Sequence, residues 1–206
     1  GLLRVARSIT VVDVDERLLR VIEDVSGREG FGISCVHHDL RRPLPEKLRG
    51  RFDVAMTDPP YTVPGLRLFL SRAMEALRGR KTASVYLAFA DKPPLEMLEV
   101  HRAITGMGLF ISELIPGFND YEGAEILANT TFMAKLATTE ETRPSVTGDF
   151  KDAIYTGEVR PTVRVYRCRC GERIEVGAST RFETIEELKK RGCPRCGGNE
   201  GFRLLK

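Results

Sequence analysis

The chain has 206 residues, 42% of them hydrophobic and 30% charged, a composition typical of one globular domain with a small appendage. No apolar run is long enough to cross a membrane, so we expect neither a membrane span nor a signal peptide. The net charge is +3, yet residues 1–140 carry 18 Lys+Arg against 19 Asp+Glu, so this part lacks the basic field of a nucleic-acid enzyme. The five cysteines suggest no disulfides, and a reducing cytoplasm fits them.

Strands and helices are predicted to alternate along residues 8–137. The expected strands are 8–12, 33–36, 52–57, 83–89, 109–115 and 130–136, and the expected helices end at Gly27, at residue 77 and at residue 107. Residues 116–123 are expected to form a loop. The strands are nearly continuous apolar runs, which is typical of parallel strands covered by helices on both faces. The sequence therefore predicts an α/β fold with a doubly wound, Rossmann-like sheet.

Each of the first three predicted strands ends at or close to an aspartate, namely Asp13, Asp39 and Asp58. In open α/β sheets ligands bind at the carboxyl ends of the strands, so these acids should gather at one edge. In nucleotide-binding members of this class, acids on neighbouring strands bind the ribose hydroxyls and the adenine amino group. This makes Asp13 and Asp39 candidate cofactor-binding residues for an adenosyl sulfonium donor. A helix cap is the alternative for a lone strand-end aspartate such as Asp13 or Asp15.

The third of these acids opens the turn Asp58-Pro59-Pro60-Tyr61. A proline cannot donate to a sheet ladder, so the strand has to end there. Asp58 can accept a hydrogen bond from an attacking amine, the Pro59 carbonyl can accept a second one, and Tyr61 offers a flat apolar wall. This arrangement is typical of enzymes that alkylate nitrogen from a sulfonium donor, and the catalytic candidates are Asp58, Pro59 and Tyr61. An ordinary strand-to-helix turn is the alternative.

The glycine-rich loop that holds an adenosyl donor, and the strand before it, have no counterpart in the sequence. In this fold that first strand lies centrally, between the strands expected at 8–12 and 52–57. Without it, both strands would have unpaired edges inside the core, at a high cost in free energy. We therefore expect a missing N-terminal segment of the same protein, or another chain, to supply the strand. A complete sheet built from residues 1–206 alone would contradict this.

The last 66 residues, 141–206, are predicted to form a separate zinc-ribbon appendage. Cys168 and Cys170 form one knuckle, and Cys193 and Cys196 form the other. Two pairs of thiolates at this spacing predict tetrahedral Zn²⁺, and with all four positions filled by protein the site should be structural. Nucleic-acid contact, a lid over the substrate pocket and a simple staple all remain open as its role.

Five segments together resemble one family of enzymes: ITVVDVDERLLRVIE, HHDLRRPLP, FDVAMTDPPYT, GLRLFLSRAMEAL and IPGFNDYE. They are similar, in order, to the N(4)-bis(aminopropyl)spermidine synthases, the branched-chain polyamine synthases found mainly in heat-loving archaea. The resemblance covers residues 1 to about 137, the C-terminal part of such enzymes, and not the cysteine knuckles. It implies a fold of the S-adenosylmethionine-dependent methyltransferase type. It also implies transfer of aminopropyl groups from decarboxylated S-adenosylmethionine to an internal amine of spermidine.

The resemblance also implies roles for individual residues. Asp13 would bind the donor's ribose and Asp39 its adenine. Asp58 would orient the attacking amine and help to deprotonate it, in a pocket shaped by Pro59, Pro60 and Tyr61. At the same sheet edge, the residues Asn119, Asp120, Tyr121 and Glu122 could hold a polycationic acceptor, the acids by charge and the tyrosine by cation–π contact. A solvated polar loop is the alternative for them.

Two other readings of the sequence remain. Asp-Pro-Pro-Tyr equally suits a nitrogen methyltransferase that acts on a nucleic-acid base, with Tyr61 stacked on a flipped base. The near-neutral charge of residues 1–140 speaks against that reading. The chain could also be a zinc-ribbon binding module on an inactive scaffold, although acids at three strand ends disfavour this. The expected partners are a polyamine substrate and the missing segment; a homodimer is left open, and no membrane contact is expected.

Overall fold

The computed structural model describes residues 6–79, 83–120, 130–155, 164–177, 180–182 and 184–205. The chain forms two units, Gly1–Ile154 and Tyr155–Lys206, each considered by itself. The division comes later than the expected boundary after residue 140 because residues 143–150 hydrogen-bond to the larger unit, for example from the Phe150 amide to the Arg41 carbonyl at 2.7 Å. None of the described helices is long and apolar enough to cross a membrane.

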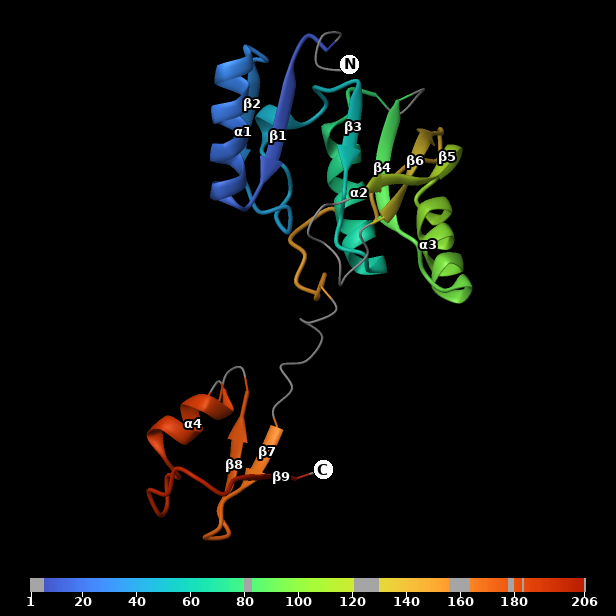
Figure 1. Ribbon diagram of the computed structural model, residues 1–206. Helices are drawn as coiled ribbons and strands as arrows, with labels where there is room; N and C mark the ends of the chain where they lie inside the picture. Colours follow the sequence, from blue (N-terminus) through green and yellow to red (C-terminus); the bar gives the residue numbers. More distant parts are fainter. Residues whose placement is uncertain are drawn as a thin grey trace. The chain divides into compact units, whose positions relative to one another are not determined.

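The larger unit alternates strands and helices up to β5, much as the apolar pattern predicts (Figure 1). Its elements are β1 (Ile9–Asp13), α1 (Glu16–Glu29), β2 (Ile33–His37), the 3₁₀ turn η2 (Glu46–Leu48), β3 (Val54–Thr57), α2 (Val63–Ala76), β4 (Ser84–Ala90), α3 (Pro94–Gly106), β5 (Leu109–Asp120) and β6 (Thr130–Thr138). Most bounds lie within two residues of the expected ones.

The strands of the larger unit form two sheets. β1 and β2 are parallel, with Ile9 opposite Ile33. The second sheet has the order β3-β4-β6-β5; β3 and β4 are parallel, while β6 is antiparallel to both of its neighbours. The expected parallel pairing is therefore present between β1 and β2 and between β3 and β4, whereas the expectation of parallel strands is wrong for β6, which makes the sheet mixed. A parallel crossover needs about a dozen residues, usually a helix, whereas only residues 121–129 separate β5 from β6.

The expected loop at 116–123 is also wrong for residues 116–120, which belong to β5. The pairing with β6 shifts register between Ile115 and Asn119, and Gly117 in between has φ 59°. Pro116 is tolerated within β5 because β5 is the outer strand of its sheet, and an outer strand does not need every backbone amide for pairing. The irregularity lets β5 run on to Asp120.

The core of the larger unit lies between α2, α3 and one face of the four-stranded sheet. The fully or nearly fully buried members include Leu66, Leu70, Val85, Leu87, Phe89, Ile104, Phe132 and Leu136. Along β3 the side chains alternate: Ala55 packs against this core, whereas Val54 and Met56 are 45% and 61% exposed. Two apolar side chains of β3 therefore lie uncovered on the opposite face.

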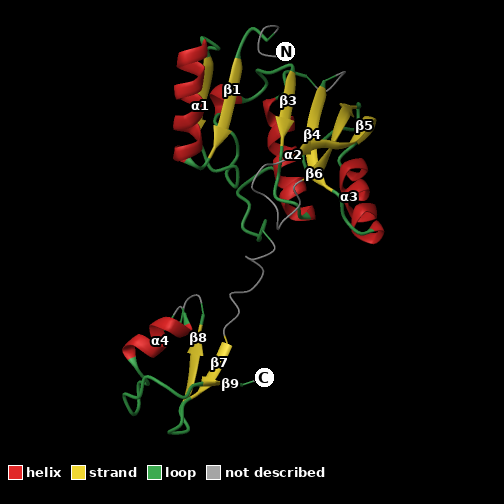
Figure 2. Ribbon diagram, viewed as in Figure 1, coloured by secondary structure: helices red, strands yellow, loops and turns green. Residues whose placement is uncertain are grey.

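No strand of the described residues lies between β1 and β3, so the two sheets stay separate (Figure 2). The facing edges of β1 and β3 thus make no ladder hydrogen bonds with each other. Within the described part of the chain, the sheet is incomplete at the position where a first strand was expected.

The smaller unit contains a three-stranded antiparallel sheet in the order β8-β7-β9. Its elements are β7 (Arg164–Arg167), β8 (Arg173–Val176), α4 (Ile185–Arg191) and β9 (Arg203–Leu204). A small core around Ile174, Phe182 and Leu188 joins sheet and helix, and it includes Cys168 and Cys193. With so few apolar residues, this unit needs a further source of stability.

Candidate functional site

The predicted site residues lie at the carboxyl ends of their strands. Asp58 directly follows β3, and Asp120 is the last residue of β5. Because β4 and β5 are both antiparallel to β6, β5 runs in the same direction as β3 and β4. Asp58 and Asp120 therefore lie at the same edge of the four-stranded sheet. Asp13 ends β1, and Asp39 follows the neighbouring parallel strand β2.

Asp13 and Asp15 make different hydrogen bonds. Asp15 is the N-cap of α1, and its carboxylate accepts the Arg17 amide at 2.9 Å. The Arg17 guanidinium, at 2.8 Å, holds the pKa of Asp15 far below its usual range. Asp13 is half-buried, and its Oδ1 accepts the Asp15 amide at 2.7 Å. The helix-capping alternative thus applies to Asp15, which leaves Asp13 as the strand-end acid.

Asp39 opens a tight turn after β2. Its Oδ1 accepts the Arg41 amide at 2.9 Å, and its carbonyl accepts the Arg42 amide at 2.9 Å. The preceding amide, of His38, donates to the Asp13 carbonyl at 2.9 Å. This hydrogen bond and the strand pairing hold the two acidic strand ends next to each other.

The turn after β3 is held tightly while its acid stays accessible. Asp58 is exposed, but the Pro60 carbonyl accepts the Thr62 amide at 2.7 Å. Thr62 is in turn the N-cap of α2, with its hydroxyl accepting the Gly65 amide at 3.1 Å. A Cβ on Gly65 would lie 2.8 Å from the Pro60 carbonyl oxygen, so this close approach requires glycine. Helix and turn together fix the backbone that carries Asp58.

Tyr61 is half-buried and belongs partly to the core. Its ring meets Phe89 of β4 edge-on, with ring centroids 5.4 Å apart and an interplanar angle of 73°. The Phe89 ring also packs against the ring of Phe132 of β6, with the two centroids 6.2 Å apart. Such aromatic pairs contribute about 0.5–1.5 kcal/mol beyond burial. They hold the Tyr61 ring in place at the end of the turn that Asp58 opens.

A buried ion pair behind these turns was not predicted. Arg72 of α2 is only 2% exposed. Its Nε donates to the Leu40 carbonyl at 2.8 Å and its Nη2 to the Gly148 carbonyl at 2.7 Å. Its Nη1 forms a 2.6 Å ion pair with Glu75, whose other oxygen accepts the Leu44 amide at 2.9 Å. The sequence signal was an arginine inside an apolar helix with a glutamate three residues later.

The Arg72 network holds residues 139–154, here called the strap, against α2. The Val146 amide donates to the Ser71 hydroxyl at 3.1 Å, and the Phe150 amide donates to the Arg41 carbonyl at 2.7 Å. At its end, the Ile154 carbonyl accepts the Thr62 hydroxyl at 2.6 Å. The strap therefore connects the turn that carries Asp39 with the turn that carries Asp58.

The predicted acceptor residues are only partly described. The side-chain amide of Asn119 donates to the Thr131 hydroxyl at 2.8 Å, so this side chain takes part in a hydrogen bond within the sheet. Asp120 is exposed at the end of β5. Tyr121 and Glu122 lie outside the described residues. Of this set, only Asp120 is placed as an available charge.

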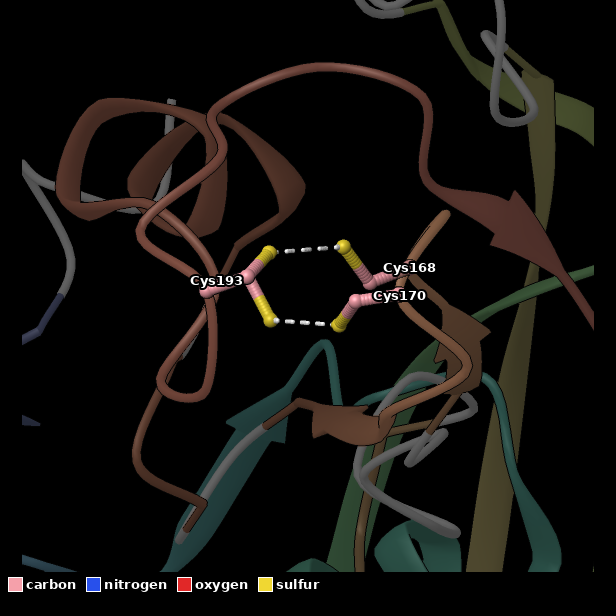
Figure 3. Close-up of side chains that lie close together, drawn as sticks. Cys168, Cys170 and Cys193 are labelled. Atoms are coloured by element: carbon pink, nitrogen blue, oxygen red, sulfur yellow. Dashed lines mark hydrogen bonds between the residues drawn. The ribbon is translucent and has the colours of Figure 1, made fainter.

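The four predicted metal ligands of the smaller unit come together. Their sulfur atoms all lie within 4.8 Å of one another, with Cys168 3.6 Å from Cys196 and Cys170 3.7 Å from Cys193. Zn–S bonds of ~2.3 Å in a tetrahedron place sulfur atoms ~3.8 Å apart, whereas a disulfide needs ~2.05 Å. Figure 3 shows Cys168 and Cys170 facing the knuckle that carries Cys193. The donor set fits Zn²⁺.

The thiol environments also favour a cation at this point. Burial works to raise the pKa of Cys193, but amides of Cys196 and Arg195 outweigh it and bring the pKa to about 7. Although the Glu172 amide lowers the pKa of Cys170, burial and the neighbouring thiols raise it to about 12. Four thiols this close cannot all ionise unless a cation neutralises them.

Fold and site together define the class of protein. The order β2-β1 and β3-β4-β6-β5, with acids at the strand ends, is that of an S-adenosylmethionine-dependent methyltransferase-like Rossmann fold whose central first strand is not among the described residues. Residues 1–185 match the model of the branched-chain polyamine synthase A C-terminal domain. The chain belongs to this family.

Two curated relatives and one solved structure set the extent of the similarity. An uncharacterized protein of Methanocaldococcus jannaschii is 48% identical over 207 residues, covering 100% of this chain and 50% of that protein. The N(4)-bis(aminopropyl)spermidine synthase of the same organism is 35% identical over 118 residues, 56% of this chain and 34% of that enzyme. The crystal structure of the branched-chain polyamine synthase from Thermus thermophilus, in complex with N4-aminopropylspermidine and 5′-methylthioadenosine, matches with TM-score 0.63 and 23% identity, over 74% of this chain and 50% of that one.

These matches differ in whether the matched region includes the four cysteines. The chain spans about half the length of the first relative, and that match includes the smaller unit. The match to the named synthase covers little more than half of this chain, and the family model ends before Cys193 and Cys196. Of these matches, the one to the uncharacterized relative therefore extends over all four cysteines of the smaller unit.

Proposed function

We propose that the protein transfers aminopropyl groups from decarboxylated S-adenosylmethionine to an internal amine of spermidine. The observation that carries this proposal is the position of Asp58, exposed in a tightly held Asp-Pro-Pro-Tyr turn at the carboxyl end of β3. Family membership supports the same reaction, since the Thermus synthase was crystallised with an aminopropylated spermidine and with 5′-methylthioadenosine. Those two molecules are what such a transfer leaves behind.

On the donor side, Asp13 binds the ribose hydroxyls and Asp39 the adenine amino group. One oxygen of each carboxylate accepts a local amide, from Asp15 and Arg41 respectively. These hydrogen bonds fix both carboxylates and leave the second oxygen of each for the donor. The strap stabilises this arrangement from behind, through the Arg41 carbonyl.

On the acceptor side, Asp58 takes the proton and orients the amine. A protonated amine is no nucleophile, so the internal nitrogen first has to lose its proton to a nearby carboxylate. Its lone pair then attacks the methylene carbon next to sulfur; the carbon–sulfur bond breaks, and its electron pair remains on sulfur. The Pro59 carbonyl accepts a second hydrogen bond from the amine, while Pro60 and Tyr61 shape the pocket. Asp120, with Tyr121 and Glu122, attracts the cationic ends of the polyamine.

The product spectrum tests the reaction. The intact, full-length protein is incubated with spermidine and either decarboxylated or ordinary S-adenosylmethionine, and products are read by mass spectrometry. We expect spermidine to gain aminopropyl groups with the decarboxylated donor only. Methyl transfer to a nucleic acid from the ordinary donor, without a polyamine product, would refute the proposal.

We also propose that a strand and apolar cover from outside this sequence complete the sheet between β1 and β3. The unpaired edges of both strands and the exposed side chains of Val54 and Met56 support this. On α1, the side chains of Leu18 and Val21 are also exposed, at 47% and 59%. Because the first two relatives are at least twice as long as the matched region, we assign this segment to the same polypeptide rather than to another chain.

A substitution on β3 distinguishes a covered face from a free one. In the full-length protein, Met56→Asp should lower the free energy of unfolding by about 2 kcal/mol or more, because the carboxylate would be buried under the added segment. Leu95→Asp on α3 is the matched control, since Leu95 is 72% exposed and should stay so. Its effect should remain within about 0.5 kcal/mol. Equal urea midpoints for the two variants would contradict the proposed cover.

For the smaller unit we propose one structural Zn²⁺ held by Cys168, Cys170, Cys193 and Cys196. The sulfur spacing and the small core support it. With all four positions filled by protein, the ion contributes folding free energy rather than chemistry. One zinc per chain, measured by mass spectrometry of metal content, is the expected result, and its absence from freshly purified protein would count against the site.

A further inference from the structure

The pairing of the small sheet places three arginines side by side. Arg167 of β7 is directly opposite Arg173 of β8 on one side and Arg203 of β9 on the other. Directly opposite residues project to the same face of a sheet, and neighbouring strands lie ~4.8 Å apart. These three residues, here called the arginine row, therefore cross the whole sheet on one face.

The arginine row faces solvent and not the core. The next position along β8, Ile174, is 5% exposed and packs into the small core together with its partner Tyr166. Side chains alternate along a strand, so the row lies on the other face. All three arginines are exposed. A fourth, Arg169, lies against Gly201, two residues before Arg203.

Without a bound ligand, the arginine row lowers the stability of the small sheet. Like charges directly opposite in a sheet are destabilising, and the structure shows no ion pair for any of the three among the described residues. Two acids of the smaller unit have other partners: a carboxylate oxygen of Glu172 lies 3.8 Å from Nη1 of Arg195, and one of Glu187 lies 3.0 Å from Nη2 of Arg191. Glu175, which is opposite Val165, lies on the same face of the sheet as the arginine row. Its single negative charge offsets only part of the charge of the three arginines.

The surrounding charge is also positive. Residues 164–206 contain 11 Lys+Arg and 6 Asp+Glu, a net charge of +5. Four thiolates around a divalent ion would reduce it by two, to +3. Residues 1–140 have a net charge of −1, so the positive field belongs to the smaller unit.

We propose that the arginine row binds the phosphodiester backbone of a nucleic acid. The planar guanidinium fork matches phosphate oxygens, and three forks in a line suit a chain of phosphates better than one anion. The aromatic rings of this sheet region, Tyr166 and Phe182, pack on the core side. Stacking on bases is therefore absent from the row, and binding should depend on salt and not on base sequence. This site is separate from the transfer chemistry and does not depend on it.

Fluorescence polarisation with the full-length protein tests the proposal. The probe is a labelled single-stranded RNA of mixed sequence, about 15 nucleotides long. A single-stranded DNA of the same sequence is measured in a separate titration, and both are measured at about 50–200 mM salt. Arg167→Gln should lower the slope of log affinity against log salt by about 0.7, and the double variant R167Q/R203Q should weaken low-salt binding about tenfold. Arg191→Gln is the matched control, because Arg191 lies on α4 and pairs with Glu187. It should bind as the parent protein does.

Three results would overturn the proposal: no binding of either strand, equal weakening by R191Q and R167Q, or tighter binding of polyglutamate than of nucleic acid. The second would indicate diffuse charge, and the third an acidic protein partner. Zinc content of each variant checks that the small unit is folded. If R167Q loses zinc, R203Q alone, which is not next to a cysteine, decides the question by the same slope.

Discussion

Asp58→Asn in the full-length protein is expected to lower the rate of aminopropyl transfer by about 10²–10⁴-fold. Asparagine keeps the size and the accepting oxygen of the side chain but cannot take the amine's proton. The deficit should shrink as pH rises, because solvent then deprotonates the polyamine. The donor KM should change little, since Asp58 does not lie on the strands that carry Asp13 and Asp39. Steady-state rates across pH, with product read by mass spectrometry, measure all three effects.

Asp53→Asn is the matched control for this experiment. Asp53 precedes β3, at the opposite end from Asp58, and its exposed carboxylate lies 3.6 Å from Arg78. An exposed pair of this kind contributes little, so both activity and stability should stay close to those of the parent protein. If D58N and D53N had the same activity, or if the D58N deficit did not depend on pH, Asp58 would not be the proton acceptor.

Arg72→Met is expected to lower the free energy of unfolding by about 3–5 kcal/mol. Methionine fills much of the same volume, but it leaves the Glu75 carboxylate without its counter-charge in a buried place. It also leaves the carbonyls of Leu40 and Gly148 without their donor. Urea unfolding, monitored by far-ultraviolet circular dichroism, measures the loss. Because the strap and the Asp39 turn depend on the same guanidinium, the remaining folded enzyme should also show a raised KM for the donor.

Two further variants separate this network from a general effect on the helix. Arg67→Met changes an exposed arginine of the same helix and should stay within about 0.5 kcal/mol of the parent. Arg72→Lys keeps the charge but not the fork, so it can satisfy Glu75 or the carbonyls and not all of them. Its stability should fall between those of R72M and the parent. An R72M variant as stable as R67M would show that the buried pair does not hold the strap.

Most of the helices and strands followed from local apolar patterning, and so did the acids at the strand ends. The strand-end prediction was accurate for Asp13 and Asp58 because a strand stops where its pattern meets a turn residue, which is a property of a few neighbouring residues. The two cysteine pairs could be recognised in the same way, since the spacing within each knuckle is local, and the structure brings their four sulfur atoms together. The gap that the described residues leave between β1 and β3 was expected from fold rules applied to the order of elements.

Other features were decided by contacts between distant residues. The antiparallel direction of β6 and the extension of β5 through Pro116 depend on which strand becomes the outer one. The choice between Asp13 and Asp15 as helix cap needed backbone geometry. Arg72 joins residues more than 70 positions apart, and nothing near it in sequence marks Gly148 as its partner.

By itself, the sequence determined the α/β pattern, the acidic strand ends and the two cysteine pairs, because each depends on spacings shorter than about one helix or strand. The tertiary structure decided how the strap links the Asp39 and Asp58 turns, and how three arginines meet on one face of the small sheet. Those arrangements depend on strand register and on the burial of a charged group. Both are set by partners far away in the chain, where hydrogen bonds must replace lost water.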